Sequence, residues 1–211
     1  MTRGVTESHN GYVIEQVRRR LAAYAAREMA NDGWPRAGVL VPVYVQSGEL
    51  HVVLTKRTER VQAHKGEVSF PGGSMEAGDA DLSVTALRES EEEIGLLREH
   101  VRIIGRLDEL VTITNFHVSA FVGEIDAAAL PYVWRPHAAE VARVLEVPLG
   151  HLLDGANLVE VPRQRDGQLV LVEGVRFGEE IIFGATWRLL RNFLDIVAHE
   201  RQQASPPEMR S

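Results

Sequence analysis

Residues 66–96 constrain this chain more than any other segment, because they place a glycine-containing turn directly before a helix crowded with carboxylates. The turn, FPGG at residues 70–73, has the glycines that allow a ligand to approach a backbone closely. Four glutamates follow between positions 89 and 93, just before a glycine stop at Gly95. Negative charge is unfavourable at the C-terminal end of a helix. Because such violations tend to mark functional sites, we infer a site here.

The spacing of these acids predicts a metal site. Glu89 and Glu93 stand one helical turn apart on the same face, and such like-charged pairs repel. Glu92 lies three residues after Glu89, so these three side chains can converge while Glu91 points away. Magnesium takes oxygen ligands and usually binds through a few carboxylates together with substrate phosphates. The alternative is that the acids form only a solvated, charged helix face.

At these residues the sequence resembles the Nudix hydrolases, whose signature is G-x5-E-x7-R-E-U-x-E-E-x-G-U, with U an aliphatic residue. The segment RESEEEIGL at residues 88–96 matches the second half, except that Ser90 replaces an aliphatic residue. In the first half, Asp79 stands where the signature has Glu, and eight residues rather than seven separate it from Arg88. The resemblance extends from about Arg36 to Leu194.

That departure is similar to one branch of the family, the coenzyme A pyrophosphatases, which carry Asp and one extra residue there. A second motif of the branch, approximately L-L-T-x-R-S/A-x3-R-x3-G-x3-F-P-G-G, matches VLTKRT at residues 53–58, then Gly66 and the FPGG turn. Thr58 replaces Ser or Ala, and Gln62 replaces the second Arg. An arginine can bind phosphate through two hydrogen bonds and an amide cannot. If the arginine holds the substrate in related proteins, Gln62 changes the substrate specificity.

The resemblance implies a Nudix-type α/β/α sandwich with a mixed β-sheet and a pyrophosphohydrolase that depends on Mg²⁺ or Mn²⁺. It implies hydrolysis of coenzyme A or acyl-coenzyme A to 3′,5′-ADP and 4′-phosphopantetheine or its acyl form. We expect Glu89 and Glu93 to bind metal, and Glu92 to bind metal or to orient the attacking water. Arg88 is expected to hold the glutamates through an ion pair.

Substrate contacts are expected from the glycine turn and the polar loop before it. Gly72 and Gly73 would bring backbone groups against metal or phosphate. Arg57, His64 and Lys65 are candidate donors to the 3′-phosphate of coenzyme A. For Arg57 the alternative is a pairing with a nearby carboxylate, and for His64 it is an ordinary surface position.

Two other functions stay open at this stage. A pyrophosphatase for ADP-ribose or nucleoside diphosphate sugars is favoured by Gln62. A non-catalytic, nucleotide-sensing Nudix module is disfavoured, because such modules often lose the acidic ligands that this chain keeps. Glu109 is a candidate additional base, with a structural role as the alternative. Tyr132 and Trp134 are candidates for contact with substrate or with a second copy in a homodimer.

Composition narrows the class of protein. The 211 residues are 45% hydrophobic and 25% charged, as in soluble globular proteins. A net charge of −7 argues against non-specific nucleic-acid binding. There is no cysteine, hence no disulfide framework or thiolate nucleophile. With neither a signal peptide nor an apolar run of membrane-spanning length, we expect a cytoplasmic protein that does not bind membranes.

We predict one domain over residues 11–200, with a flexible arm over residues 1–10 and a disordered tail over residues 201–211. Apolar residues at helical spacing predict a first helix from about Val13 to Met29 and a last one around Trp187 to Val197. The predicted strands lie at about residues 37–45, 50–55, 101–107, 116–125, 158–163 and 168–177.

Overall fold

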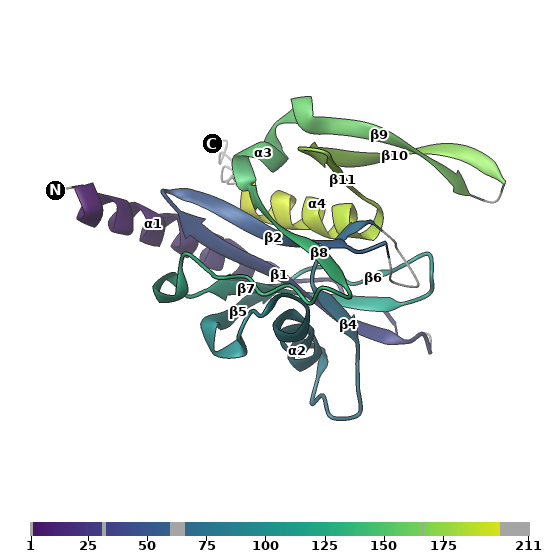
Figure 1. Ribbon diagram of the computed structural model, residues 1–211, viewed down its shortest axis with the longest axis horizontal. Helices are drawn as coiled ribbons and strands as arrows, with labels where there is room; N and C mark the ends of the chain where they lie inside the picture. The colour runs from purple at the N-terminus through teal and green to yellow at the C-terminus, as the bar shows by residue number, and fades with distance from the viewer. Residues whose placement is uncertain (1, 31–32, 60–65, 166, 199–211) are drawn as a thin grey trace, which may run out of the picture.

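The computed structural model describes residues 2–30, 33–59, 66–165 and 167–198 (Figure 1). Of the predicted site residues, His64 and Lys65 lie outside the described residues, as does the predicted tail.

The α-helices are α1 (Thr2–Ala22), α2 (Leu82–Ile94), α3 (Leu149–Leu153) and α4 (Gly184–Ala198). Short 3-10 helices are η1 (Arg98–His100), η2 (Ala127–Ala129) and η3 (Gly155–Asn157). The strands are β1 (Arg36–Gln46), β2 (Glu49–Arg57), β3 (Val68–Ser69), β4 (Gly72–Ser74), β5 (Val101–Arg106), β6 (Leu110–Val111), β7 (His117–Ile125), β8 (Val141–Pro148), β9 (Leu158–Arg165), β10 (Gln168–Phe177) and β11 (Glu180–Phe183).

Strands β1 to β8 form one mixed sheet. Its main path is β3-β2-β1-β7-β5, with β4 on β1, β6 on β7 and β8 on β2. Strands β1 and β7 pair in parallel, with Val39 opposite Ala120, whereas β1 pairs antiparallel with β2 and β4. Strands β9, β10 and β11 form a separate antiparallel sheet beside α4 (Figure 1).

Helices cover both faces of the mixed sheet (Figure 1). Alternate residues of β1 point to opposite faces, so Val41 and Val43 pack with α1 and α4 while Leu40 and Tyr44 pack with α2. The predicted α/β/α sandwich is therefore confirmed. None of the helices among the described residues is both long enough and apolar enough to cross a membrane.

The first helix differs from the prediction at both ends. It begins at Thr2 rather than near Val13, and it ends at Ala22 rather than near Met29. Tertiary contacts hold the residues after Ala22 in a non-helical path. The Tyr24 hydroxyl donates to Asp108 at 2.6 Å, and the Met29 amide donates to Glu109 at 2.9 Å. These bonds replace the helical ones that the apolar periodicity predicts.

Candidate active site

Helix α2 carries the predicted acids, and both of its ends are capped. The Asp81 side chain accepts hydrogen bonds from the amides of Ser83 and Val84 at the start, which are donors that lack helical partners. Gly95 ends the helix in the left-handed conformation, with φ of 69°, as its position in the sequence predicts. Ser90, which replaces an aliphatic residue of the signature, is buried, and its hydroxyl donates to the Ala86 carbonyl at 2.7 Å.

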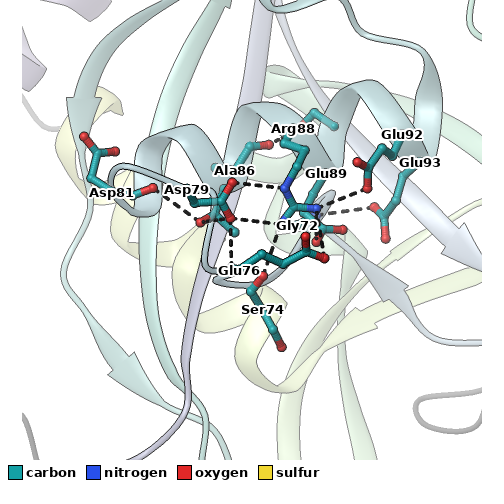
Figure 2. Close-up of polar contacts among 12 residues, drawn as sticks. Gly72, Ser74, Glu76, Asp79, Asp81, Ala86, Arg88, Glu89, Glu92 and Glu93 are labelled. Carbon is teal, nitrogen blue, oxygen red and sulfur yellow. Dashed lines mark hydrogen bonds and ion pairs between the residues drawn. The ribbon is translucent and has the colours of Figure 1, made fainter.

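Arg88 lies at the centre of the polar contacts in Figure 2. Its Nε and Nη2 donate to the two carboxylate oxygens of Asp79 at 3.1 and 3.0 Å. Its Nη1 donates to Glu89 at 2.9 Å and to Glu92 at 3.2 Å. Hydrogen bonds from Arg88 lower the pKa of Asp79, and the amide of Glu76 contributes to this shift. Arg88 thus fixes the position of two glutamates, while Asp79 fixes Arg88.

Glu93 is the most buried of the three predicted ligands, with a side chain 4% exposed. Its Oε2 accepts from the Gly72 amide at 3.3 Å, and its Oε1 lies 3.6 Å from Nη1 of Arg57. Both contacts are longer than an ordinary hydrogen bond. Burial raises the pKa of Glu93 to about 8; Arg57 opposes this rise, and Glu89 adds to it. The contacts with Arg57 and Gly72 therefore stabilise the ionised Glu93 carboxylate by less than burial destabilises it.

Glu89 lies against Gly73 of strand β4. A β-carbon placed on Gly73 would come within 2.4 Å of the Glu89 carboxylate, so only glycine leaves room for it. Burial raises the pKa of Glu89, and the hydrogen bond from Arg88 opposes this rise. Glu93 is thus a buried and Glu89 a partly buried carboxylate on one helix face, and burial disfavours the ionised form of both.

The remaining two acids differ in exposure and in partner. Glu92 has a side chain 59% exposed, and Arg88 is its partner. Glu91 points away from the other three, as predicted, and pairs with Nε of Arg98 at 3.0 Å. Of the three predicted ligands, Glu92 therefore has the greatest access to solvent.

Glu89, Glu92 and Glu93 do not form a ready three-ligand metal group in this structure. No three His, Cys, Asp or Glu side chains in the described part of the chain form a group that could hold a metal ion. The reason lies in the two arginines, because Arg88 contacts Glu89 and Glu92 while Arg57 pairs with Glu93.

The donor set nevertheless fits a hard divalent cation. Glu93 is buried and Glu89 is partly buried, both carboxylates are incompletely compensated, and Gly73 leaves the Glu89 carboxylate close to the backbone of β4. Carboxylate oxygens are the ligands that Mg²⁺ and Mn²⁺ prefer. A bound cation would favour the ionised form of both carboxylates.

Glu140 is a further carboxylate near this cluster, and the sequence pattern does not assign it to the site. Its charge helps to raise the pKa of both Glu89 and Glu93. The loop before β8 brings it there, since the His137 amide donates to the Glu93 carbonyl at 2.8 Å and the Thr58 amide donates to the Glu140 carbonyl at 2.8 Å. Glu140 lies within a segment that resembles the family, but its distance from the helix in sequence conceals its proximity.

Two candidate roles from the sequence are not supported by the structure. Glu109 has a side chain 4% exposed and accepts from His117 at 2.8 Å and Ser119 at 2.5 Å, so it anchors β6 and β7. The Tyr132 hydroxyl donates to the Gly95 carbonyl at 3.0 Å and accepts from the Leu97 amide at 2.9 Å. Tyr132 therefore closes the end of α2 and has its hydroxyl engaged within the chain.

Comparisons with known proteins show which family the chain resembles. A family model described as the NUDIX domain matches residues 34–151. "Uncharacterized Nudix hydrolase NudL" of Cronobacter sakazakii is 43% identical over 120 residues, which are 56% of this chain and 59% of that protein. The protein of the same name from Yersinia pestis is 31% identical over 163 residues, which are 77% of this chain and 80% of that protein.

A solved structure supports the fold alone. The crystal structure of a MutT/nudix family protein from Enterococcus faecalis matches with a TM-score of 0.55 and 12% identity, over 94% of this chain and 75% of that one. Because the family model covers more than half of the chain and a relative above 30% identity covers most of it, the chain belongs to the Nudix hydrolase family.

Proposed function

We propose that this protein is a divalent-metal-dependent pyrophosphohydrolase of nucleoside diphosphate derivatives, with coenzyme A and its acyl thioesters as the preferred substrates. The products would be 3′,5′-ADP and 4′-phosphopantetheine or its acyl form. The observation that carries the proposal is the pair of under-compensated carboxylates, buried Glu93 and partly buried Glu89, beside the two glycines of β4. A divalent cation would supply the positive charge that this arrangement lacks, and it could bind the oxygens of a diphosphate at the same time.

Glu89 and Glu93 would hold the cation, with Glu92 as a third candidate ligand. Bound Mg²⁺ or Mn²⁺ would neutralise charge on the diphosphate oxygens and lower the pKa of water. The backbone of Gly72 and Gly73 would lie against the phosphate or the metal. Arg88 is a positioning residue in this account, because its guanidinium spans the Asp79, Glu89 and Glu92 carboxylates.

Glu92 is the best-placed candidate for orienting the attacking water. Its side chain is 59% exposed, so water reaches it, and Arg88 fixes its position. A carboxylate held in this way accepts a hydrogen bond from water and can receive its proton as the oxygen attacks phosphorus. In this account the less accessible carboxylates, Glu89 and Glu93, bind the cation, and the accessible one, Glu92, orients the water.

The preference for coenzyme A depends on the sequence motif rather than on the helix. The segment at residues 53–58, Gly66 and the FPGG turn match the branch, whereas Gln62 departs from it. That departure favours ADP-ribose or a nucleoside diphosphate sugar as the second candidate substrate. A purely sensing role is disfavoured, because Glu89, Glu92 and Glu93 are all retained.

Product analysis tests this proposal. The purified protein would be incubated with Mg²⁺ or Mn²⁺ and, separately, coenzyme A, dephospho-coenzyme A, ADP-ribose and a UDP-sugar. We expect coenzyme A to have the highest kcat/KM and to release 3′,5′-ADP. A preference for ADP-ribose would reject the coenzyme A assignment but keep the reaction class, and no metal-dependent hydrolysis of any of the four would reject the reaction class.

A further inference from the structure

Arg57 occupies an unusual position for a predicted substrate contact. It ends β2, where the pairing with β8 changes register between Lys56 and Arg57. Its Nη1 lies 3.6 Å from Glu93, and its side chain is 24% exposed. Its Nε is buried and has no hydrogen-bond partner among the described residues. Among the described residues, the Arg57 side chain is thus held by one long ion pair, with a buried donor left unsatisfied.

Arg88 provides the contrast within the same site. Its guanidinium makes hydrogen bonds of 2.9 to 3.2 Å to three carboxylates and to the Ser74 carbonyl. Releasing Arg88 would break all of these bonds, whereas releasing Arg57 would break, within the described part of the chain, a single side-chain contact beyond hydrogen-bond length. Of the two arginines, Arg57 is therefore the one that can change partner at small cost.

The partner of Arg57 is also the carboxylate assigned to the cation. Glu93 has one oxygen facing Arg57 and the other facing the Gly72 amide. A divalent cation bound to Glu93 would replace the charge that Arg57 now supplies and would repel the guanidinium. Full contact with both at once is therefore unfavourable, and the two cations compete for one buried carboxylate.

We propose that Arg57 neutralises Glu93 until the divalent cation binds, and that cation binding then releases Arg57 to clamp the substrate diphosphate. This inference rests on the proposed function and assigns Arg57 to the diphosphate rather than to the 3′-phosphate of coenzyme A. A guanidinium released here has free donors in a planar fork that matches phosphate oxygens. The substrate diphosphate then replaces Glu93 as the negatively charged partner of Arg57.

Metal binding without nucleotide tests the first half. Mn²⁺ affinity would be measured by electron paramagnetic resonance of free Mn²⁺ for the wild type, Arg57→Ala and Arg57→Gln. Both variants remove the competitor, so we expect Mn²⁺ to bind about fivefold tighter or more. Arg98→Ala is the matched control. This variant also removes a positive charge near the same helix end, but Arg98 pairs with Glu91 and not with Glu93. The control should change Mn²⁺ affinity less than about twofold.

Binding of a non-hydrolysable diphosphate tests the second half. Affinity for α,β-methylene-ADP would be measured by calorimetry at saturating Mn²⁺. We expect Arg57→Ala and Arg57→Gln to weaken this binding by about tenfold or more, because a charged hydrogen-bond donor is lost. Arg98→Ala should leave it unchanged. Thermal melts of each variant would confirm that it is folded, and either folded variant of Arg57 suffices for the test.

The opposite signs of the two effects distinguish this inference from simpler roles. Tighter Mn²⁺ binding together with weaker diphosphate binding supports the exchange of partners. If Mn²⁺ binds no tighter to the Arg57 variants than to Arg98→Ala, or if diphosphate binding is unaffected, the exchange is wrong while the wild type still hydrolyses its substrate. If the wild type neither binds Mn²⁺ nor hydrolyses a diphosphate, the proposed function itself fails.

Discussion

Gly73 and Glu89 approach each other so closely that a β-carbon on Gly73 would lie 2.4 Å from the carboxylate carbon of Glu89. Strand β4 and helix α2 therefore meet at a point where no side chain other than hydrogen fits without displacing the carboxylate. This contact explains why the turn and the acid cluster belong together. The turn provides room for a carboxylate that stands close to the backbone.

Gly73→Ala should impair catalysis more than folding. The added methyl group would displace Glu89, and displacements of about 1 Å in an active site reduce rates on the order of a hundredfold. We expect kcat/KM to fall by about that factor, with the far-ultraviolet spectrum unchanged. Gly78→Ala is the matched control, because the space around Gly78 is open. Equal activity of the two variants would show that this contact has no catalytic importance.

Asp79→Asn should destabilise the protein in a pH-dependent manner. The folded pKa of Asp79 is lowered, chiefly by hydrogen bonds from Arg88, so its contribution to stability is present above its unfolded pKa of about 3.9. That contribution is lost as the pH falls through the lower, folded pKa. The free energy of unfolding of wild type minus variant should be constant from about pH 5 to 8 and should shrink below about pH 4. A difference that did not change with pH would contradict this pairing.

Tyr132→Phe should affect stability and leave activity intact. Its hydroxyl bridges Gly95 and Leu97 at the end of α2, so removal leaves two backbone groups with lost partners. We expect a loss of about 1–2 kcal/mol in urea unfolding, with kcat/KM within about twofold of wild type. Tyr12→Phe serves as the control, since Tyr12 is 63% exposed. A selective rise in KM for Tyr132→Phe would instead restore the substrate contact expected from the sequence.

Arg57→Ala should lower kcat/KM alike for coenzyme A and dephospho-coenzyme A. The sequence predicts a contact with the 3′-phosphate, which only coenzyme A carries. The ion pair with Glu93 places Arg57 beside the carboxylates that would hold the cation, where both substrates present the same diphosphate. Steady-state kinetics with the two substrates distinguish a contact of Arg57 with the diphosphate from a contact with the 3′-phosphate. A loss about tenfold greater for coenzyme A would return Arg57 to the 3′-phosphate.

Local spacing was sufficient to predict α2, its Gly95 stop and the outward direction of Glu91, because these depend on neighbours within two helical turns. The valine-rich run at residues 37–45 and the Ser47-Gly48 turn after it similarly predict β1 and β2. The approach of Glu140 and the pairing of Arg57 with Glu93 could not be predicted in this way. Both depend on the loop before β8 and on the register change in β2, which are products of long-range packing.

The early end of α1 has the same origin. The apolar spacing continues to Tyr24, but the hydroxyl of Tyr24 bonds Asp108, far away in sequence. Arg18 on α1 is likewise held by a residue distant in sequence, since it pairs with Glu124 on β7. Periodicity identifies which residues are buried but not the tertiary hydrogen bonds that end a helix.

The most direct test of the metal centre compares hydrolysis by Glu93→Gln and Glu91→Gln at low Mg²⁺, with coenzyme A as substrate. Each variant replaces one carboxyl group of α2 by an amide, but of the two only Glu93 faces Gly72 of β4. We predict that Glu93→Gln loses at least about a hundredfold in kcat while Glu91→Gln stays near wild type, and that metal-free Glu93→Gln is no less stable than wild type. Near-normal turnover by Glu93→Gln would contradict the assignment of the metal centre.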